Sequence, residues 1–239
     1  MVIGGLEKLT LIDYPGELAA IVFTQGCNFR CHFCYNPMLV WPVKEGKLKY
    51  KRDHSFFEEN DLFDFLRSRI GKLSGVVITG GEPTLHQDLP EFLKKVKDLG
   101  YKIKLDSNGT NPEMLKRVLD LELVDYLAMD IKNSPARYDK AVNVGVNLDK
   151  LQESIKMIIE SGLPHEFRTT VVPGIHTKED FRGMGEMIRG ADKWYLQFFK
   201  SDTELVDREF EGKDKFMIKD MEEMAEIGRG FVKLCEVRG

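Results

Sequence analysis

The chain has 239 residues, a length that favours one sizeable hydrophobic core and a single domain spanning 1–239. Hydrophobic residues make up 42% and charged residues 31% of it, which excludes a disordered or fibrous protein. The net charge of −4 argues against nucleic acid as a partner, and no apolar run approaches the roughly 18 residues of a membrane span. The N-terminal stretch lacks the features of a signal peptide, so we expect a cytoplasmic protein.

Short apolar runs alternate with amphipathic runs along the chain. The short runs are rich in β-branched or aromatic residues and predict strands at 18–24, 75–80, 101–107, 124–131, 166–172 and 193–199. Apolar residues at helical spacing predict helices at 55–72, 89–100, 111–122, 147–162, 177–190 and about 216–235. This alternation predicts an α/β fold with a parallel sheet, and both a barrel and an open doubly wound sheet fit it.

Polar or glycine-rich segments follow several of the predicted strands. In chain order they are the cysteine-rich loop 25–37 and the stretches TGGEPT (79–84), DSNGT (106–110) and DIK (130–132). Ligands of parallel α/β folds bind at the carboxyl ends of the strands. We therefore expect these segments to form one site.

Three of the four cysteines, Cys27, Cys31 and Cys34, lie in the loop 25–37. Their spacing also fits one face of a helix, and free cysteine is often buried as a small hydrophobe. The residues between them make a poor helix, however, and clustered cysteines in a reducing compartment more often bind metal or do redox chemistry. The loop is therefore a candidate metal or cluster site.

Structural zinc almost always takes four protein ligands. His32 and His54 lack zinc-finger spacing, and Cys235 lies about two hundred residues away. Cysteine thiolates also hold iron–sulfur clusters. Three thiolates around a four-iron cluster would leave one iron open for another ligand.

The stretch CNFRCHFC resembles the C-x3-C-x-aromatic-C motif of the radical S-adenosylmethionine (radical SAM) superfamily, with Phe33 as the aromatic residue. TGGEP at 79–83 resembles the second motif of that superfamily. The resemblance implies a single-domain, partial (β/α)6 TIM-like barrel with parallel strands. It also implies a [4Fe–4S] cluster on Cys27, Cys31 and Cys34, whose open iron is chelated by the methionyl amine and carboxylate of SAM.

Three residues of the second motif are candidate SAM contacts. Gly80 and Gly81 would let the backbone approach a ligand closely, and the carboxylate of Glu82 suits the methionyl amine. The alternative is a tight strand-to-helix turn with an acid at its N-terminal end. The resemblance favours the SAM site.

Further SAM contacts are implied at Ser107 and Asn108, although Asn-Gly is also a common turn pair. Asp130 and Lys132, two residues apart, should point to the same side of a strand and must be satisfied by each other or by a ligand. The glycyl-radical activating enzymes have a similar pair near the ribose and carboxylate of SAM. Arg168 resembles their carboxylate-binding arginine.

Three other residues complete the list of candidates. Asp106 could help hold a monovalent cation, as in some activating enzymes. That cation would lie near both Asp106 and Asp130. Gln197 should face the cavity but matches no known role. Cys235, on the predicted last helix, is more typical of a core residue than of a ligand.

Within the superfamily the chain resembles the glycyl-radical activating enzymes, and among them the activating protein of anaerobic ribonucleoside-triphosphate reductase. The resemblance rests on the opening GLEKLTLIDYPGELAAIVFTQGCNFRCHFCYNP and on the lack of the extra cysteines of a ferredoxin-like insertion. It implies that a reduced cluster passes an electron to SAM, which yields methionine and a 5′-deoxyadenosyl radical. That radical takes hydrogen from a glycine Cα of the partner, and no side chain beyond the cluster and SAM is expected to be catalytic.

The partners implied are a glycyl-radical enzyme and a flavodoxin- or ferredoxin-type electron donor. Two alternatives stay open. A radical SAM enzyme acting on a small molecule, such as a deazapurine precursor, would share the same cofactor-binding features. A zinc-stabilised binding module would need four ligands and no SAM pocket.

Overall fold

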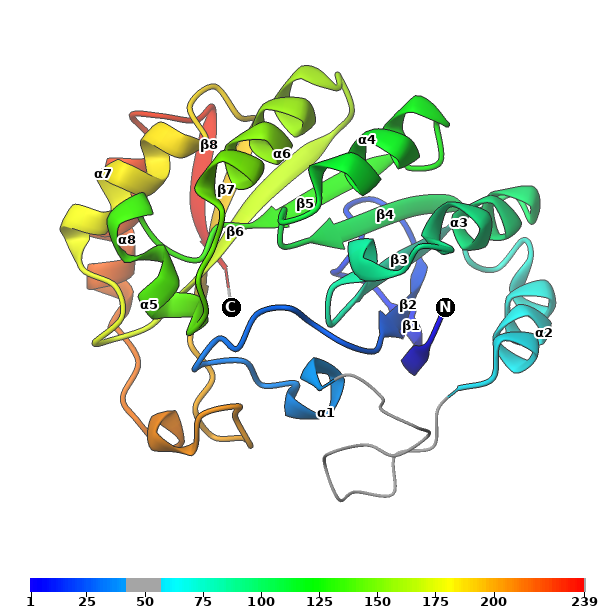
Figure 1. Ribbon diagram of the computed structural model, residues 1–239, viewed down its shortest axis with the longest axis horizontal. Helices are drawn as coiled ribbons and strands as arrows, with labels where there is room; N and C mark the ends of the chain where they lie inside the picture. The colour runs from blue at the N-terminus through cyan, green and yellow to red at the C-terminus, as the bar shows by residue number, and fades with distance from the viewer. Residues whose placement is uncertain (42–56, 239) are drawn as a thin grey trace. The chain divides into compact units, whose positions relative to one another are not determined.

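A computed structural model describes residues 1–41 and 57–238 of the chain (Figure 1). The strands follow one another in the sheet in chain order, from β1 to β8, and the sheet is not closed into a barrel. The described residues form two compact units. Unit 1 comprises Met1–Asn28, Met38–Ser107 and Glu113–Leu127, and unit 2 comprises Phe29–Pro37, Asn108–Pro112 and the chain from Ala128 onward.

Unit 1 contains the strands β1 (Ile3–Thr10), β2 (Ala19–Thr24), β3 (Gly75–Gly80) and β4 (Lys102–Ser107). β1 pairs antiparallel with β2, whereas β2, β3 and β4 are parallel. The sequence AAIVFT of β2 is buried at nearly every position, as expected for a strand covered on both faces. Its helical elements are α2 (Glu59–Arg69), η1 (Pro83–Leu85), α3 (Leu89–Asp98), most of α4 (Pro112–Asp120) and most of α1 (Pro37–Val40).

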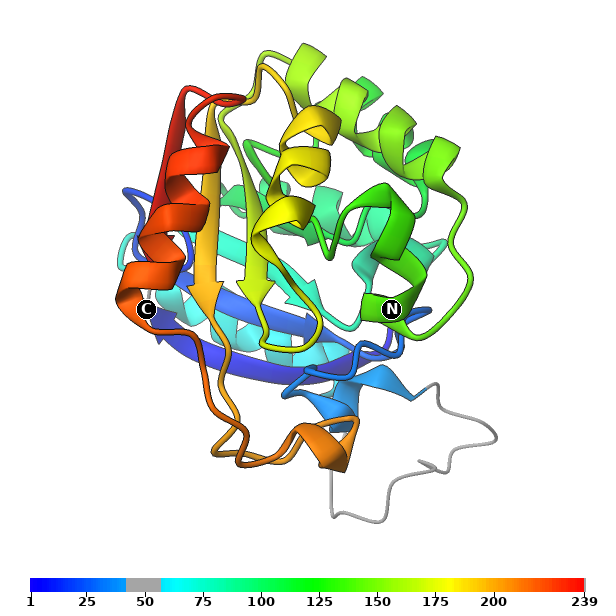
Figure 2. The same ribbon diagram turned by 90° about the vertical axis from the view of Figure 1, so that its left-hand side faces the viewer.

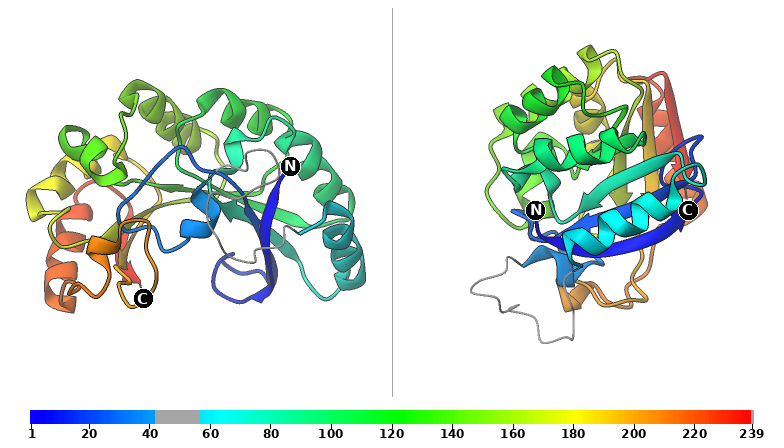
Figure 3. Two further views of the ribbon diagram at one scale, coloured as in Figure 1. Left: turned by 60° about the horizontal axis from the view of Figure 1, so that its bottom comes forward. Right: turned by 90° about the vertical axis from the view of Figure 1, so that its right-hand side faces the viewer.

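The core of unit 1 lies on both faces of this sheet. On one face Tyr14, Ile21 and Val77 belong to one buried apolar cluster. Helix α3 packs beside β4 (Figure 3), and its Phe92 ring lies 5.5 Å from Phe63 of α2. The apolar residues of these helices occur at helical spacing, so that each helix buries a single stripe.

Unit 2 contains the parallel strands β6 (His165–Val171), β7 (Lys193–Phe198) and β8 (Leu234–Arg238). Its helical elements are η2 (Pro135–Arg137), α5 (Tyr138–Val142), α6 (Leu148–Glu160), α7 (Lys178–Met187), η3 (Arg208–Phe210) and α8 (Ile218–Gly228). Helices α7 and α8 pack against each other, and α8 contacts β7 and β8 (Figure 2). Strand β5 (Tyr126–Asp130) contributes residues to both units.

The prediction of an α/β fold with a mostly parallel sheet is confirmed. All six predicted strands are present as β2 to β7, each within about two residues of its expected bounds. The antiparallel β1 and the last strand β8 were not predicted. The predicted helix at 55–72 begins outside the described residues, which also exclude His54. The single-domain bounds 1–239 stay a prediction.

The predicted helix at about 216–235 is wrong in its second half. Helix α8 ends at Gly228, and residues 234–238 form β8, in which Cys235 lies opposite Trp194 of β7. The physical reason is close packing of this strand on the end of the helix. A Cβ at Gly228 would lie 2.5 Å from the Cys235 sulfur and 3.0 Å from the Trp194 ring, so glycine is required where the chain leaves the helix.

No helix in the described ranges combines the length and the apolar content needed to cross a bilayer.

Candidate active site

The first cysteine belongs to unit 1, where it follows β2. Cys27 donates its backbone N–H to the Val40 carbonyl at 3.0 Å, and Gly26 donates to the Leu39 carbonyl at 2.7 Å. The side-chain amide of Gln25 donates to the carbonyls of Met38 and Trp41, both at 2.8 Å. The backbone carrying Cys27 is therefore tied to the segment 38–41.

The other two motif cysteines, Cys31 and Cys34, belong to unit 2. The Cys34 N–H donates to the Cys31 carbonyl at 3.1 Å, which closes a turn that brings these residues together. Burial raises the pKa of the Cys34 thiol. Phe33 between them is 4% exposed, lies edge-on to His176 at 6.3 Å, and has the Lys132 ammonium 5.9 Å from its ring centre.

The three cysteines stay predicted ligands. All four cysteines of the chain lie in the described residues, and none forms a disulfide. Across residues 1–41 and 57–238, no group of three or more His, Cys, Asp or Glu side chains is placed to hold a metal ion. Cys235 is fully buried in β8, where burial raises the pKa of its thiol to about 12, as befits a core residue.

The glycines of the second motif pack directly against the strand that precedes Cys27. In the parallel register Thr24 pairs with Gly80, so the carboxyl ends of β2 and β3 lie side by side. A Cβ at Gly80 would lie 2.6 Å from the Thr24 oxygen, and one at Gly81 would lie 2.5 Å from the Gly26 carbonyl carbon. Both glycines are therefore required by a close approach of the chain to itself, whatever ligand they also contact.

Glu82 is 1% exposed and sits at the N-terminal end of η1. Its Oε1 accepts hydrogen bonds from the Thr84 N–H at 3.1 Å, the Thr84 hydroxyl at 2.6 Å and the Ser107 hydroxyl at 2.9 Å. The structure thus brings the predicted residues Glu82 and Ser107 together. It also contains the strand-to-helix turn that the sequence left as the alternative for Glu82.

The segment after β4 contains the predicted turn. Asn108, in unit 2, is 6% exposed, and its Oδ1 accepts from the N–H and the hydroxyl of Thr110 at 3.0 and 2.7 Å. This is an Asx-type turn. In unit 1, Asp106 forms an ion pair with Lys104 at 2.7 Å, and Lys104 is only 1% exposed. Lys104 was not predicted as a site residue, although it lies two residues before Asp106 on the same strand face.

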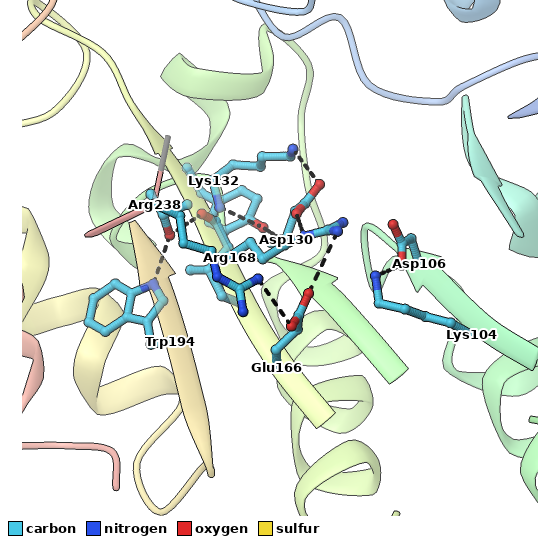
Figure 4. A network of polar contacts seen from close by, with 11 residues as sticks. Lys104, Asp106, Asp130, Lys132, Glu166, Arg168, Trp194 and Arg238 are labelled. Carbon is cyan, nitrogen blue, oxygen red and sulfur yellow. Dashed lines mark hydrogen bonds and ion pairs between the residues drawn. The ribbon is translucent and has the colours of Figure 1, made fainter. Parts of the chain in front are cut away.

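Asp130, Lys132 and Arg168 meet in unit 2 (Figure 4). The Lys132 ammonium lies 3.0 Å from Asp130 Oδ2, and Arg168 Nε donates to Asp130 Oδ1 at 2.9 Å. Burial alone would raise the pKa of Asp130, but the Arg168 guanidinium and the Lys132 ammonium outweigh it and hold that pKa well below its usual range. Asp130 is therefore a carboxylate that binds two cations at once.

A second carboxylate, Glu166, extends this network and was also not predicted. It is 2% exposed and lies 3.9 Å from Arg168 Nη1 and 3.6 Å from Arg238 Nη1 (Figure 4). The guanidinium carbon of Arg238 lies 3.2 Å from the Tyr195 ring centre. Gln197 pairs in register with Arg238 and is half-buried. The period of two along β6 relates Glu166 to Arg168 and is the signal that could have found it.

His176 is another buried polar side chain of this region. Its Nδ1 accepts the Val172 N–H at 3.0 Å, so Nε2 carries the proton and donates to the Lys132 carbonyl at 2.8 Å. The ring is 2% exposed, and burial lowers its pKa to about 4. His176 is thus a neutral link between the segments that carry Lys132 and Val172.

Comparison with known proteins assigns the family. The sequence model of the radical SAM superfamily matches residues 21–188. The chain belongs to the radical SAM superfamily. It is therefore an enzyme of radical SAM type, and the predicted superfamily is confirmed.

Several named proteins have similar sequences. A Methanocaldococcus jannaschii protein named as a glycyl-radical enzyme activating enzyme is 28% identical over 99% of this chain and 95% of its own. A pyruvate formate-lyase-activating enzyme of Streptococcus mutans is 28% identical over 78% of this chain and 72% of its own. A Thermococcus kodakarensis protein named as a GTP 3′,8-cyclase is 25% identical over 86% of this chain and 64% of its own.

Solved structures share the fold. SuiB of Streptococcus suis, in a crystal structure with S-adenosylmethionine, matches with a TM-score of 0.65 at 16% identity. The match covers 92% of this chain, which spans about half (49%) of SuiB. A domain of a pyruvate-formate lyase-activating enzyme of Bacteroides vulgatus matches with a TM-score of 0.54 at 18% identity, over 70% of this chain and 99% of that domain.

Membership of the superfamily implies a [4Fe–4S] cluster and SAM, and the chemistry of the three motif cysteines fits the cluster. Three thiols at the C-x3-C-x2-C spacing supply the soft ligands that iron–sulfur clusters take. The Glu82 N–H donates to the Gly26 carbonyl at 2.8 Å, so the second motif is fixed against the segment that carries Cys27.

Proposed function

We propose that the protein is a glycyl-radical activating enzyme whose partner is a glycyl-radical enzyme, specifically an anaerobic ribonucleoside-triphosphate reductase. The observation that carries the proposal is the alignment with the M. jannaschii protein, which is named as an activating enzyme and matches over 99% of this chain and 95% of its own. Because the alignment covers nearly all of both chains, the similarity includes the regions outside the cofactor motifs. The choice of the reductase rests on the resemblance of the chain's opening and on the lack of the extra cysteines of a ferredoxin-like insertion.

The roles we propose begin with the cluster. Cys27, Cys31 and Cys34 would hold it, and the bound cluster and SAM supply the reductive cleavage that forms the 5′-deoxyadenosyl radical. Glu82 would bind the methionyl amine, because a buried carboxylate fixed by Thr84 and Ser107 is a preorganised acceptor for an ammonium group.

The remaining SAM contacts would come from side chains already fixed by their neighbours. Arg168 would bind the methionyl carboxylate, because Asp130 holds its Nε and so fixes the plane of the guanidinium. Asp130 and Lys132 would bind the ribose and carboxylate region. Phe33, Gly80, Gly81, Ser107 and Asn108 would complete the SAM contacts.

A monovalent cation near Asp106 and Asp130 is a further part of the proposal. Each carboxylate already has a protein cation of its own, Lys104 at 2.7 Å from Asp106 and Lys132 at 3.0 Å from Asp130. An added cation would therefore share these oxygens. Replacing potassium and sodium in the assay by tetramethylammonium tests it, since an unchanged rate of SAM cleavage would remove the cation from the proposal.

The proposed setting is the cytoplasm, with a flavodoxin- or ferredoxin-type protein as electron donor. The test combines anaerobically reconstituted protein, a reductant, SAM and the candidate reductase, and detects a glycyl doublet by EPR together with released methionine. The doublet on the reductase supports the proposal. Methionine release with no doublet on the reductase would contradict it.

A second candidate is a radical SAM enzyme that acts on a small molecule. The likeness to the protein named as a GTP 3′,8-cyclase, over 86% of this chain, favours it specifically. Uptake of label from deuterated candidate substrates into 5′-deoxyadenosine distinguishes the two, because a small-molecule enzyme would abstract deuterium with no partner protein present. Tight stoichiometric zinc without any response to SAM would instead support the zinc-stabilised module.

A further inference from the structure

The segment that follows β7 forms a closed surface loop within unit 2. The Gly212 N–H donates to the Ser201 carbonyl at 2.8 Å, and the Ser201 hydroxyl donates to the Lys213 carbonyl at 2.6 Å, so the two ends of the loop are joined. Leu205, which belongs to this loop, is buried, with 1% of its surface exposed. A surface loop of this length with joined ends and its own packed side chain is an Ω-loop, and we refer to residues 201–213 by that name.

The tip of the Ω-loop is bonded to the loop that carries Cys31 and Cys34 (Figure 3). The Val206 N–H donates to the Cys34 carbonyl at 2.9 Å, and the Asp207 N–H donates to the His32 carbonyl at 3.2 Å. These two backbone hydrogen bonds join the Ω-loop to residues 32–34, a stretch that lies about 170 residues earlier in the sequence and ends at the motif residue Cys34.

The side chain of His32 is held twice by the same Ω-loop. Its Nδ1 lies 2.6 Å from Asp207 Oδ2. Its ring stacks on Phe210 with the ring centres 5.3 Å apart and the planes 28° apart. The Lys213 ammonium lies 4.0 Å from the centre of the Phe210 ring, and this cation–π contact favours a fixed position of that ring. His32 is thus fixed in both position and ring orientation.

The carboxylate of Asp207 is itself held in place by a second hydrogen bond. Its second carboxylate oxygen accepts the Glu209 N–H at 3.0 Å, because Asp207 caps the N-terminal end of η3. The Asp207 and His32 side chains are 29% and 22% exposed, and a contact so accessible to water contributes little to the stability of the fold. The geometry is therefore better explained by what it positions than by global stability.

We propose that Asp207 is a positioning residue, which acts through His32 to hold Cys31 and Cys34 in the arrangement that the cluster requires. Phe210 supports the same histidine from its ring face. Neighbours that orient metal ligands commonly matter for affinity almost as much as the ligands do. The inference rests on the proposed role of Cys31 and Cys34 as cluster ligands.

The first test uses the cluster-free protein and so does not depend on activity. Hydrogen–deuterium exchange of peptides that cover residues 29–37 is compared for the wild type, Asp207→Ala and Asp207→Asn. We expect exchange to be about tenfold faster in Asp207→Ala, the factor that corresponds to loss of one hydrogen bond to a charged group. Asp207→Asn keeps an oxygen that can accept from Nδ1–H and should recover part of the protection.

The second test follows the cluster after anaerobic reconstitution. Iron loss to a chelator should be about tenfold faster in Asp207→Ala than in the wild type. The EPR signal of the reduced cluster, and its change on adding SAM, should differ from the wild type as well. Glu209→Gln is the matched control, because Glu209 is exposed and lies two residues further along the Ω-loop. This substitution removes one negative charge, as Asp207→Ala does.

The results of these two tests distinguish failure of the positioning role of Asp207 from failure of the proposed function. Unchanged exchange of residues 29–37 in Asp207→Ala would overturn the inference. Faster exchange with unaltered iron loss and EPR signal would also overturn it, since the Ω-loop would then order the backbone without positioning the ligands. A wild-type protein that takes up no iron and sulfide would refute the cluster and the positioning role together. Equal effects from Glu209→Gln would show that loop charge alone is responsible.

Discussion

The packing of the second motif against the segment that precedes Cys27 can be tested through Gly81. In Gly81→Ala the new methyl carbon would lie 2.5 Å from the Gly26 carbonyl carbon and 2.9 Å from the Leu39 oxygen. All of these neighbours are backbone atoms, which cannot rotate away as a side chain could. Relief of the overlap therefore requires the second motif to move away from residues 24–39.

The cost can be worked from the bonds that this movement breaks. Gly81 N–H donates to the Thr24 carbonyl at 2.9 Å, and Glu82 N–H donates to the Gly26 carbonyl at 2.8 Å. Loss of the two bonds costs about 2 kcal/mol. Overpacking adds about 1–3 kcal/mol. We expect the free energy of unfolding to fall by about 3–5 kcal/mol, a large part of the roughly 5–15 kcal/mol of a typical domain.

The assay is equilibrium urea unfolding of the cluster-free protein, with Gly145→Ala as the control. Gly145 is exposed, has a negative or extended φ, and a Cβ there would meet nothing within 4 Å. That variant should change stability by less than about 0.5 kcal/mol. If Gly81→Ala were as stable as Gly145→Ala, the close approach of Gly81 to Gly26 and Leu39 would not be what requires the glycine.

Three further predictions concern other residues. Cys31→Ala should abolish cluster binding and SAM cleavage together, and retention of both, by iron content and methionine release, would refute its assignment as a ligand. Asp130→Ala should lower the free energy of unfolding by about 3 kcal/mol, because it leaves Lys132 and Arg168 close together without their shared carboxylate, whereas Asp130→Asn should cost less. Because the folded-state pKa of His176, about 4, lies below the ordinary 6.5, the unfolded chain binds the extra proton first, and stability should fall as pH drops from 6.5 towards 4. Between pH 7 and pH 5 we expect a loss of about 2 kcal/mol in urea unfolding, and a His176→Asn variant that kept the same slope would assign it to another group.

The sequence predicted the six central strands because buried parallel strands are continuous apolar runs with few alternatives. It did not predict β1, whose sequence IGGLEKLT contains two adjacent glycines and reads as a turn. The structure explains one of them, because a Cβ at Gly4 would lie 2.5 Å from the Leu39 side chain. That requirement comes from a residue far along the chain, which no local pattern reveals.

The candidate site was predictable where a motif or strand period fixed it. Glu82 with Ser107, and Asp130 with Lys132, were named from the sequence and lie within hydrogen-bonding distance in the structure. Lys104 was missed because a lysine in a strand is ordinarily assigned to solvent, yet it is almost fully buried. The Asp106 carboxylate pairs with its ammonium, and the Tyr126 ring, with its centre 5.8 Å from that ammonium, comes from another strand that no local pattern reveals.

The network in unit 2 also bears on how Arg168 could recognise a carboxylate. Its Nε is already bonded to Asp130, and its Nη1 lies 3.9 Å from Glu166, so two carboxylates share one guanidinium. A third carboxylate could approach only against the repulsion of the other two, unless further cations balance it. Lys132 beside Asp130 and Arg238 beside Glu166 supply these charges. The residues missed from the sequence, Glu166 and Arg238, therefore belong to the same electrostatic balance as the residues predicted from it.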